Sequence, residues 1–195
     1  MNRQGDKKVK SVAVYCGSSN GSSGVYIEEA KKLGKELAKR NITLIYGGSS
    51  IGLMGAVADS VLEMGGKAIG VMPRFLDNRE ISHRSLSELL VVETMHERKA
   101  KMVELADGFI ALPGGAGTME EFFEVYTWAQ VGLHKKPIGL LNTNRYYDPL
   151  IALLNHMNKE QFLQDQYRSM ALIAEHPAGL LDQFRNYESP PVKTY

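Results

Sequence analysis

Short apolar runs alternate with helical patterns along most of this 195-residue chain. The runs are rich in valine, isoleucine and leucine, as is typical of strands that are buried on both faces. Strands that alternate with helices are joined by right-handed crossovers and therefore pair in parallel. The expected strands occupy residues 12–16, 42–46, 68–72, 89–92, 108–112, 138–141 and 171–174.

Between these runs, apolar residues recur every three or four positions, which indicates helices that cover a sheet. We expect an α/β fold, a doubly wound, mostly parallel sheet in a Rossmann-like three-layer sandwich. No repeat or linker divides the chain, so the prediction is a single domain over residues 9–188 with flexible tails at 1–8 and 189–195. The main helices are expected at residues 27–38, 52–64, 95–106, 118–133, 147–158 and 177–187.

Composition excludes several classes of function. A net charge of +1 gives no reason to expect nucleic acid or an acidic membrane surface as a partner. The single cysteine, Cys16, rules out an internal disulfide framework, and no apolar stretch is long enough to span a bilayer. The polar start lacks a signal segment, so a cytoplasmic protein is expected. The five histidines have no metal-ligand spacing, and we predict neither a metal nor a cofactor.

Three of the expected strands end in glycine-rich turns, at residues 17–21, 47–52 and 113–118. In a parallel sheet these turns share the carboxyl edge, where ligands bind. Each turn alone is an ordinary chain reversal, but three on one edge favour an anionic ligand such as a nucleotide. None continues as a Walker loop, and none has good dinucleotide-binding spacing.

The third turn reads Pro-Gly-Gly-Ala-Gly-Thr-Met-Glu-Glu over residues 113–121. Its glycines and the N-terminus of the helix that follows suit a phosphate. Thr118 and Glu121 have the spacing of a capping box, which would give the carboxylate a purely structural role. The adjacent Glu120 exceeds what a cap needs, so a catalytic carboxylate beside a phosphate site remains the alternative.

Arg98 and Lys99 lie within or beside the apolar stripe of the helix at residues 95–106. Burying an unpaired cation is unfavourable. In a structural interpretation, the two side chains extend to the helix end or each pairs with a carboxylate. In a functional interpretation, they project into the ligand cleft toward phosphate or Glu121.

The helix at residues 118–133 is apolar nearly all round, with Phe122, Tyr126 and Trp128 on its surface. Such a helix needs a second burial partner. We therefore expect a homodimer.

Two of these segments carry a resemblance to a known family. Residues 113–121 match the pattern PGGxGTxxE, and residues 95–100 are similar to MHxRKA. Together they resemble the LONELY GUY (LOG) family, which hydrolyses cytokinin riboside 5′-monophosphates. The resemblance runs from about Val12 to His176. It implies a Rossmann-like dimer that cleaves the N-glycosidic bond of an N6-substituted AMP, in the manner of an AMP nucleosidase, to give the base and ribose 5-phosphate.

The resemblance also implies residue roles. Arg98 and Glu121 would be the catalytic pair, residues 115–118 would hold the phosphate, Lys99 would assist binding, and Glu80 and Thr127 would contact substrate. Two positions depart from the family: Ala116 stands where tyrosine is frequent, and Ser49 where another glycine is frequent. The complete set of candidate substrate- and phosphate-binding residues is Ser18, Gly47, Gly48, Glu80, Lys99, Gly114, Gly115, Ala116, Gly117, Thr118, Met119, Glu120 and Thr127.

Two other functions are compatible with parts of the pattern. A nucleotide carrier or sensor would use the same glycine turns without needing Arg98 and Glu121 together. Members of the family have often been labelled lysine decarboxylases, but that chemistry needs pyridoxal phosphate on a Schiff-base lysine. Lys99 is the only lysine expected near the cleft, and no frame for such a cofactor accompanies it.

Overall fold

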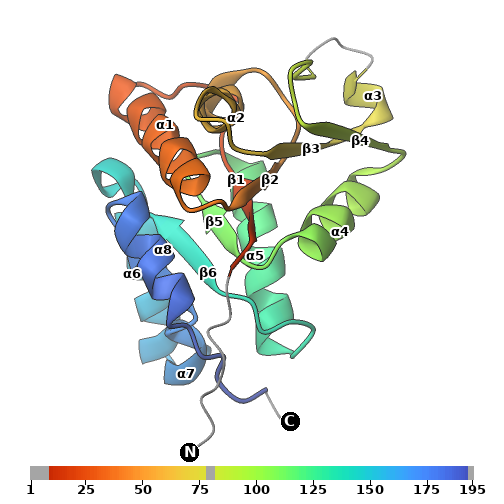
Figure 1. Cartoon of the computed structure of the whole chain (residues 1–195). Coiled ribbons are helices and arrows are strands. Elements are labelled where there is room, and N and C mark those ends of the chain that lie inside the picture. Colours follow the sequence, from red (N-terminus) through yellow and green to blue (C-terminus); the bar gives the residue numbers. More distant parts are fainter. Residues whose placement is uncertain (1–8, 78–81, 193–195) are drawn as a thin grey trace, which may run out of the picture.

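The computed structural model describes residues 9–77 and 82–192. At least one helix lies between each strand and the next along the chain (Figure 1). The elements are β1 (Ser11–Tyr15), α1 (Gly24–Lys39), β2 (Thr43–Tyr46), α2 (Gly52–Glu63), β3 (Ala68–Pro73), α3 (Arg74–Asp77), β4 (Glu88–Val92), α4 (Met95–Leu105), β5 (Phe109–Ala111), α5 (Ala116–Gln130), β6 (Ile138–Leu141), the 3₁₀ helix η1 (Thr143–Arg145), α6 (Asp148–Lys159), α7 (Asp165–Arg168), β7 (Ala171–Ala174) and α8 (Pro177–Arg185).

The seven strands form one sheet in the order β4-β3-β2-β1-β5-β6-β7, and every neighbouring pair is parallel. Each expected strand is present, with its ends within two residues of the prediction. The α/β class and the doubly wound arrangement are therefore confirmed.

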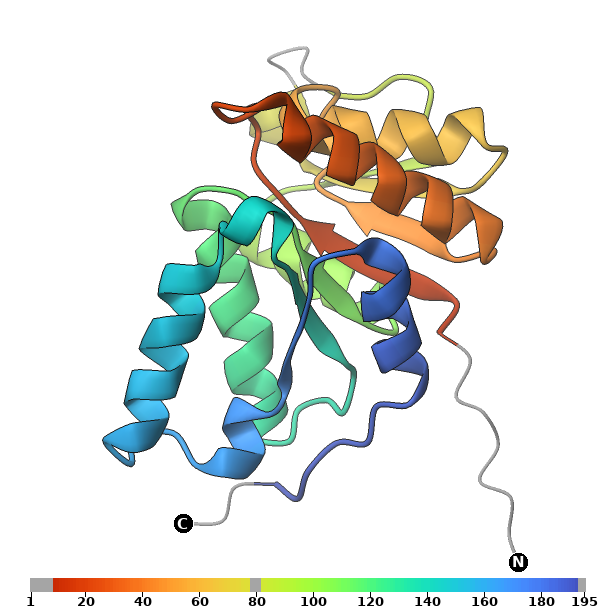
Figure 2. The same cartoon turned by 90° about the vertical axis from the view of Figure 1, so that its left-hand side faces the viewer.

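Side chains of β1 alternate between two separate cores. Val12 and Val14 pack with residues of α1, α2 and α8 on one face of the sheet. Ala13 and Tyr15 pack with residues of α4, α5, α6 and α7 on the other. Figure 2 shows α1 beside α2 over one part of the sheet, and α1 also contacts α8. The three layers follow from this alternation, because successive residues of a strand point to opposite faces.

The strand order reverses at β1, which lies between β2 and β5. The chain builds outward from β1 to β4 and then crosses back to β5 on the other side of β1. The turns that follow β1 and β5 meet there: Gly17 N donates to the Pro113 carbonyl at 3.0 Å, and Leu53 N donates to the Gly17 carbonyl at 3.1 Å. Open α/β sheets bind ligands at such a switch point.

The start of α5 corrects one prediction. The helix begins at Ala116 rather than Thr118, with Gly115 as its N-cap in an extended conformation. Thr118 is consequently a buried residue of the first turn and cannot cap the helix. The capping-box interpretation of Thr118 and Glu121 is wrong, because the backbone becomes helical two residues earlier than the spacing implied.

Three short elements were not predicted: α3, α7 and η1. Each is a single turn of three or four residues, too short to show a helical period. Within the described residues, no helix is both long and apolar enough to cross a membrane.

Candidate active site

The N-terminus of α5 is open toward the carboxyl edge of the sheet. Gly115, Ala116 and Gly117 are exposed, and none of their N–H groups makes a backbone hydrogen bond to the described residues. The first N–H groups of a helix have no partner within it and carry partial positive charge. This end of α5 therefore offers free donors to an anion.

Gly114 fixes the approach to that helix end. A Cβ on Gly114 would overlap the Thr118 hydroxyl and would lie 2.8 Å from Gly17 N. Only glycine lets the turn after β5 lie this close to the turn after β1. Gly115 and Gly117, in contrast, face open space.

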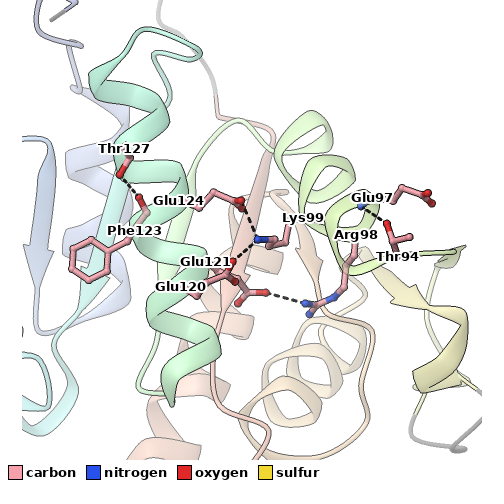
Figure 3. Close-up of polar contacts among 9 residues, drawn as sticks. All are labelled: Thr94, Glu97, Arg98, Lys99, Glu120, Glu121, Phe123, Glu124 and Thr127. Carbon is pink, nitrogen blue, oxygen red and sulfur yellow. Dashed lines mark hydrogen bonds and ion pairs between the residues drawn. The ribbon is translucent and has the colours of Figure 1, made fainter.

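Arg98 of α4 points at Glu121 of α5. Its Nη1 donates to Glu121 Oε1 at 3.0 Å, and its Nε donates to the Val71 carbonyl at 3.1 Å (Figure 3). Both charged side chains are nearly buried, with 11% of Arg98 and 10% of Glu121 exposed. Of the alternatives that the sequence left open for the two basic residues, the structure shows pairing with carboxylates, and the partner of Arg98 is Glu121 on α5.

Burial and charge oppose each other at Glu121. Burial, the larger effect, raises the pKa of the carboxyl above its usual range, while the Arg98 guanidinium partly offsets the rise. Glu120 raises the pKa further, and the more distant Lys99 lowers it. The result is a carboxylate with a raised proton affinity, as a general base requires.

Lys99 is the second bridge between α4 and α5. Its ammonium forms an ion pair with Glu120 and another with Glu124, the latter at 3.0 Å (Figure 3). The hydrogen bond that Lys99 donates to Glu120 is the main cause that raises the pKa of Lys99, so the group is held as a cation. Glu124 was not among the predicted site residues, although its four-residue spacing from Glu120 places both on one side of α5.

The second glycine turn makes room for the arginine. A Cβ on Gly47 would overlap Arg98 Nη2 and would lie 2.9 Å from Met54 Sδ. Gly48 has φ of 78°, and its carbonyl accepts a hydrogen bond from His83 N at 2.8 Å. These contacts give the two glycines packing roles, while the predicted contact with phosphate stays a prediction.

The remaining predicted residues are spread around this centre. Ser18 is exposed on the first glycine turn, and Met119 is half-buried in α5. Thr127 is exposed and donates a hydrogen bond to the Phe123 carbonyl at 2.7 Å; Figure 3 shows it further along α5, away from Arg98 and Glu121. Glu80 lies outside the described residues.

The chain matches a known family over most of its length. A family model described as "possible lysine decarboxylase" matches residues 54–184. The cytokinin riboside 5′-monophosphate phosphoribohydrolase LOG of Oryza sativa subsp. japonica is 45% identical over 180 residues, which are 92% of this chain and 74% of that protein. The cytokinin riboside 5′-monophosphate phosphoribohydrolase of Rhodococcoides fascians is 45% identical over 178 residues, 91% of this chain and 90% of that protein. The chain belongs to the LOG family.

More distant structures share the fold. The molybdenum cofactor carrier protein of Chlamydomonas reinhardtii superposes with a TM-score of 0.70 at 18% identity, covering 92% of this chain and 98% of its own. The molybdenum cofactor binding protein of Rippkaea orientalis also gives a TM-score of 0.70, at 20% identity and the same coverage. At these identities the similarity shows only that the proteins share the three-layer fold.

Proposed function

We propose that this protein hydrolyses the N-glycosidic bond of N6-substituted adenosine 5′-monophosphates to the free base and ribose 5-phosphate. The observation that supports it most is the buried Arg98–Glu121 pair beside the open N-terminus of α5. The names of the relatives give the same substrate class, cytokinin riboside 5′-monophosphates.

The spacing along α5 suits such a substrate. The 5′-phosphate binds the free N–H groups at residues 115–117, and Glu121 lies five residues beyond Ala116. At the rise of an α-helix this separation is about 7.5 Å. A ribose bridges the two places, with its phosphate on the turn and its anomeric carbon near the carboxylate.

Bond cleavage proceeds through an oxocarbenium-like ribose. Glu121 stabilises the positive sugar and removes a proton from the attacking water, whose oxygen bonds to the anomeric carbon. The base departs with the electrons of the glycosidic bond and regains a proton through solvent. Arg98 keeps Glu121 oriented, and the guanidinium N–H groups not bonded to Glu121 or Val71 can position the sugar or balance charge on the departing base.

The first test is Glu121→Gln with AMP and isopentenyl-AMP as substrates. General base catalysis is worth about 10²–10⁴-fold, so turnover should fall by that factor while the protein folds normally. Glu104→Gln is the control, since Glu104 is exposed on α4 and forms its ion pair with Lys101, away from Glu121. Near-wild-type hydrolysis by Glu121→Gln would reject the role.

The same assay separates the hydrolase from a carrier. Release of free base and ribose 5-phosphate by the wild-type protein supports the hydrolase, whereas tight nucleotide binding without products supports the carrier. Comparison of the two substrates shows whether the N6 side chain is required.

Lysine decarboxylation is disfavoured by the state of Lys99. A Schiff-base lysine must be available as a free amine. Lys99 is instead engaged by Glu120 and Glu124, which stabilise its protonated form.

We also propose that the protein is a cytoplasmic homodimer. The inward face of α5 is covered by its own chain, but Val131 and Leu133 just beyond it are 41% and 69% exposed. A second copy that covers this end would remove apolar surface from water. Sedimentation as a monomer at micromolar concentration would reject the dimer, and cell fractionation tests the location.

A further inference from the structure

Two tyrosines after β6 hold the carbonyl groups of the phosphate turn. The Tyr146 hydroxyl donates to the Gly114 carbonyl at 2.6 Å, and the Tyr147 hydroxyl donates to the Leu112 carbonyl at 2.5 Å. Neither residue was a candidate from the sequence. Both lie after β6, so α5 and β6 separate them in the sequence from the turn that they contact.

The segment that carries the tyrosines is itself firmly held. The Asn142 side chain accepts from Tyr147 N at 2.7 Å and donates to Asp148 at 2.9 Å. Asn144 and Arg145 adopt φ of 50° and 59°, in the left-handed region that residues other than glycine rarely occupy. Such strain persists where the surroundings over-determine the conformation, often next to a functional site.

The bond from Tyr146 sets the direction of a donor. The peptide unit between Gly114 and Gly115 is planar, and none of the described peptide bonds is cis. Its N–H therefore points opposite to its C=O. Because the carbonyl faces the Tyr146 hydroxyl, the N–H of Gly115, the N-cap of α5, is turned away from Tyr146.

The bond from Tyr147 has no such consequence. The peptide unit after the Leu112 carbonyl belongs to Pro113, which has no N–H. Tyr147 is also 1% exposed and belongs to the core, whereas Tyr146 is 41% exposed. The two tyrosines thus form a natural pair: one orients a free donor and the other only anchors the turn.

The Tyr146 ring also connects the first glycine turn to the third. It packs edge-on against Tyr26 at 5.9 Å between ring centroids. A Cβ on Gly21, at the end of the first turn, would lie 2.8 Å from the Tyr26 ring. The Tyr26 hydroxyl makes no hydrogen bond to the described residues, so removing it changes no polar contact.

We propose that Tyr146 is a positioning residue for the 5′-phosphate, acting by aiming the Gly115 N–H at the anion. The inference rests on the proposed function for the identity of the anion. It predicts that loss of the Tyr146 hydroxyl weakens phosphate binding while the chemical step stays intact.

The test measures ribose 5-phosphate and adenosine binding by calorimetry, together with kcat and KM for the nucleotide. In Tyr146→Phe, the dissociation constant for ribose 5-phosphate and KM should both rise by about 3–10-fold, as the loss of one hydrogen bond implies. The affinity for adenosine, which has no phosphate, should stay within twofold, and kcat should change little. Tyr26→Phe should match the wild type in every measurement.

Tyr147→Phe distinguishes positioning from general support of the turn. It should lower the thermal unfolding midpoint, because it leaves a buried carbonyl without its partner, but it should keep the affinity for ribose 5-phosphate. Equal affinities of wild type and Tyr146→Phe for ribose 5-phosphate would overturn the proposal. So would a matching loss of adenosine affinity, or a wild type that binds no ribose 5-phosphate. A wild type that binds ribose 5-phosphate but cleaves no nucleotide would reject the proposed function alone.

Discussion

Replacing Arg98 by methionine should make the stability of the protein depend on pH through Glu121. The change removes the charge and both hydrogen bonds of Arg98 and keeps an unbranched side chain in the space. Glu121 stays 90% buried without its counterion, since only 10% of its side chain is exposed. A buried pair broken on one side typically costs about 3–5 kcal/mol.

Protonation of Glu121 limits that cost. Bringing a free glutamate from ionised to neutral at pH 7 takes about 1.4 kcal/mol per pH unit over roughly 2.7 units, or about 3.7 kcal/mol. The lost hydrogen bond to the Val71 carbonyl adds about 1 kcal/mol at every pH. Arg98→Met should therefore lose about 3–5 kcal/mol at pH 7 and only about 1–2 kcal/mol near pH 4.5.

The direction of the pH dependence follows from the raised pKa. Burial already raises the pKa of Glu121 in the wild type, and removal of Arg98 raises it more. A carboxyl with a raised folded-state pKa binds more protons when folded than when unfolded. Its stabilisation is complete below the unfolded pKa and is lost as pH rises through the folded one. The variant should lose stability over a wider pH range than the wild type.

Urea unfolding between pH 4.5 and 8, followed by the fluorescence of the single tryptophan, Trp128, measures this effect. The double variant Arg98→Met/Glu121→Gln has no carboxyl group at position 121, so its stability difference from the single variant Glu121→Gln should not change with pH. A loss in Arg98→Met that does not change with pH, or an equal pH dependence of the difference between the double variant and Glu121→Gln, would refute the assignment of Glu121 as a buried, arginine-compensated carboxylate.

Two further changes test the surroundings of the pair, and a third tests an exposed glycine of α8. Lys99→Met removes a cation that lowers the pKa of Glu121, so the acidic limb of the pH profile of kcat should move to higher pH. Lys101→Met is the control, because the partly exposed Lys101 pairs with Glu104 on its own helix; an unchanged limb in Lys99→Met would contradict the prediction. Gly47→Ala drives a methyl into the Arg98 guanidinium and should reduce kcat/KM by more than about tenfold, as expected when a catalytic group is displaced; full activity would show that Arg98 can shift freely. Gly179→Ala, inside α8 with no atom within 4 Å of the new Cβ, should leave activity unchanged and raise the free energy of unfolding by about 0.5–1 kcal/mol in urea titrations.

The sheet could be predicted because its signal is local. Strands buried on both faces are short apolar runs, and Ile138–Leu141 and Ala171–Ala174 match their predicted ranges without error. Parallel pairing then follows from the intervening helices. Single helical turns such as α3 and α7 contain too few residues to show the helical period of apolar residues, so the sequence did not predict them.

From the residues alone the site could be predicted only in part, and the family resemblance implied the pairing of Arg98 with Glu121. Helical spacing placed Arg98 and Lys99 on the buried side of their helix, which requires counterions. It named Glu121 as one possible counterion but not Glu120 or Glu124, since the pairing depends on how α4 and α5 are rotated against each other. The predicted start of α5 was wrong because the N-cap, Gly115, has no side chain that could mark the position. The threonine at position 118, with Glu121 three residues later, resembled a capping box and indicated a start there instead.

The charges around the pair explain why the proposed function assigns the phosphate to backbone donors. Arg98 and Lys99 face three carboxylates, those of Glu120, Glu121 and Glu124, so this cluster carries one net negative charge. Both cations are already committed to carboxylates, and a dianion placed beside them would meet repulsion from Glu121. The free N–H groups at the start of α5 lie about one ribose away from that charge, so in the proposed function they attract the phosphate without disturbing the pair. In the proposed arrangement, Gly114 allows the close approach of the turn and Tyr146 orients the Gly115 N–H, so the binding of the anion is separate from the chemistry of Glu121.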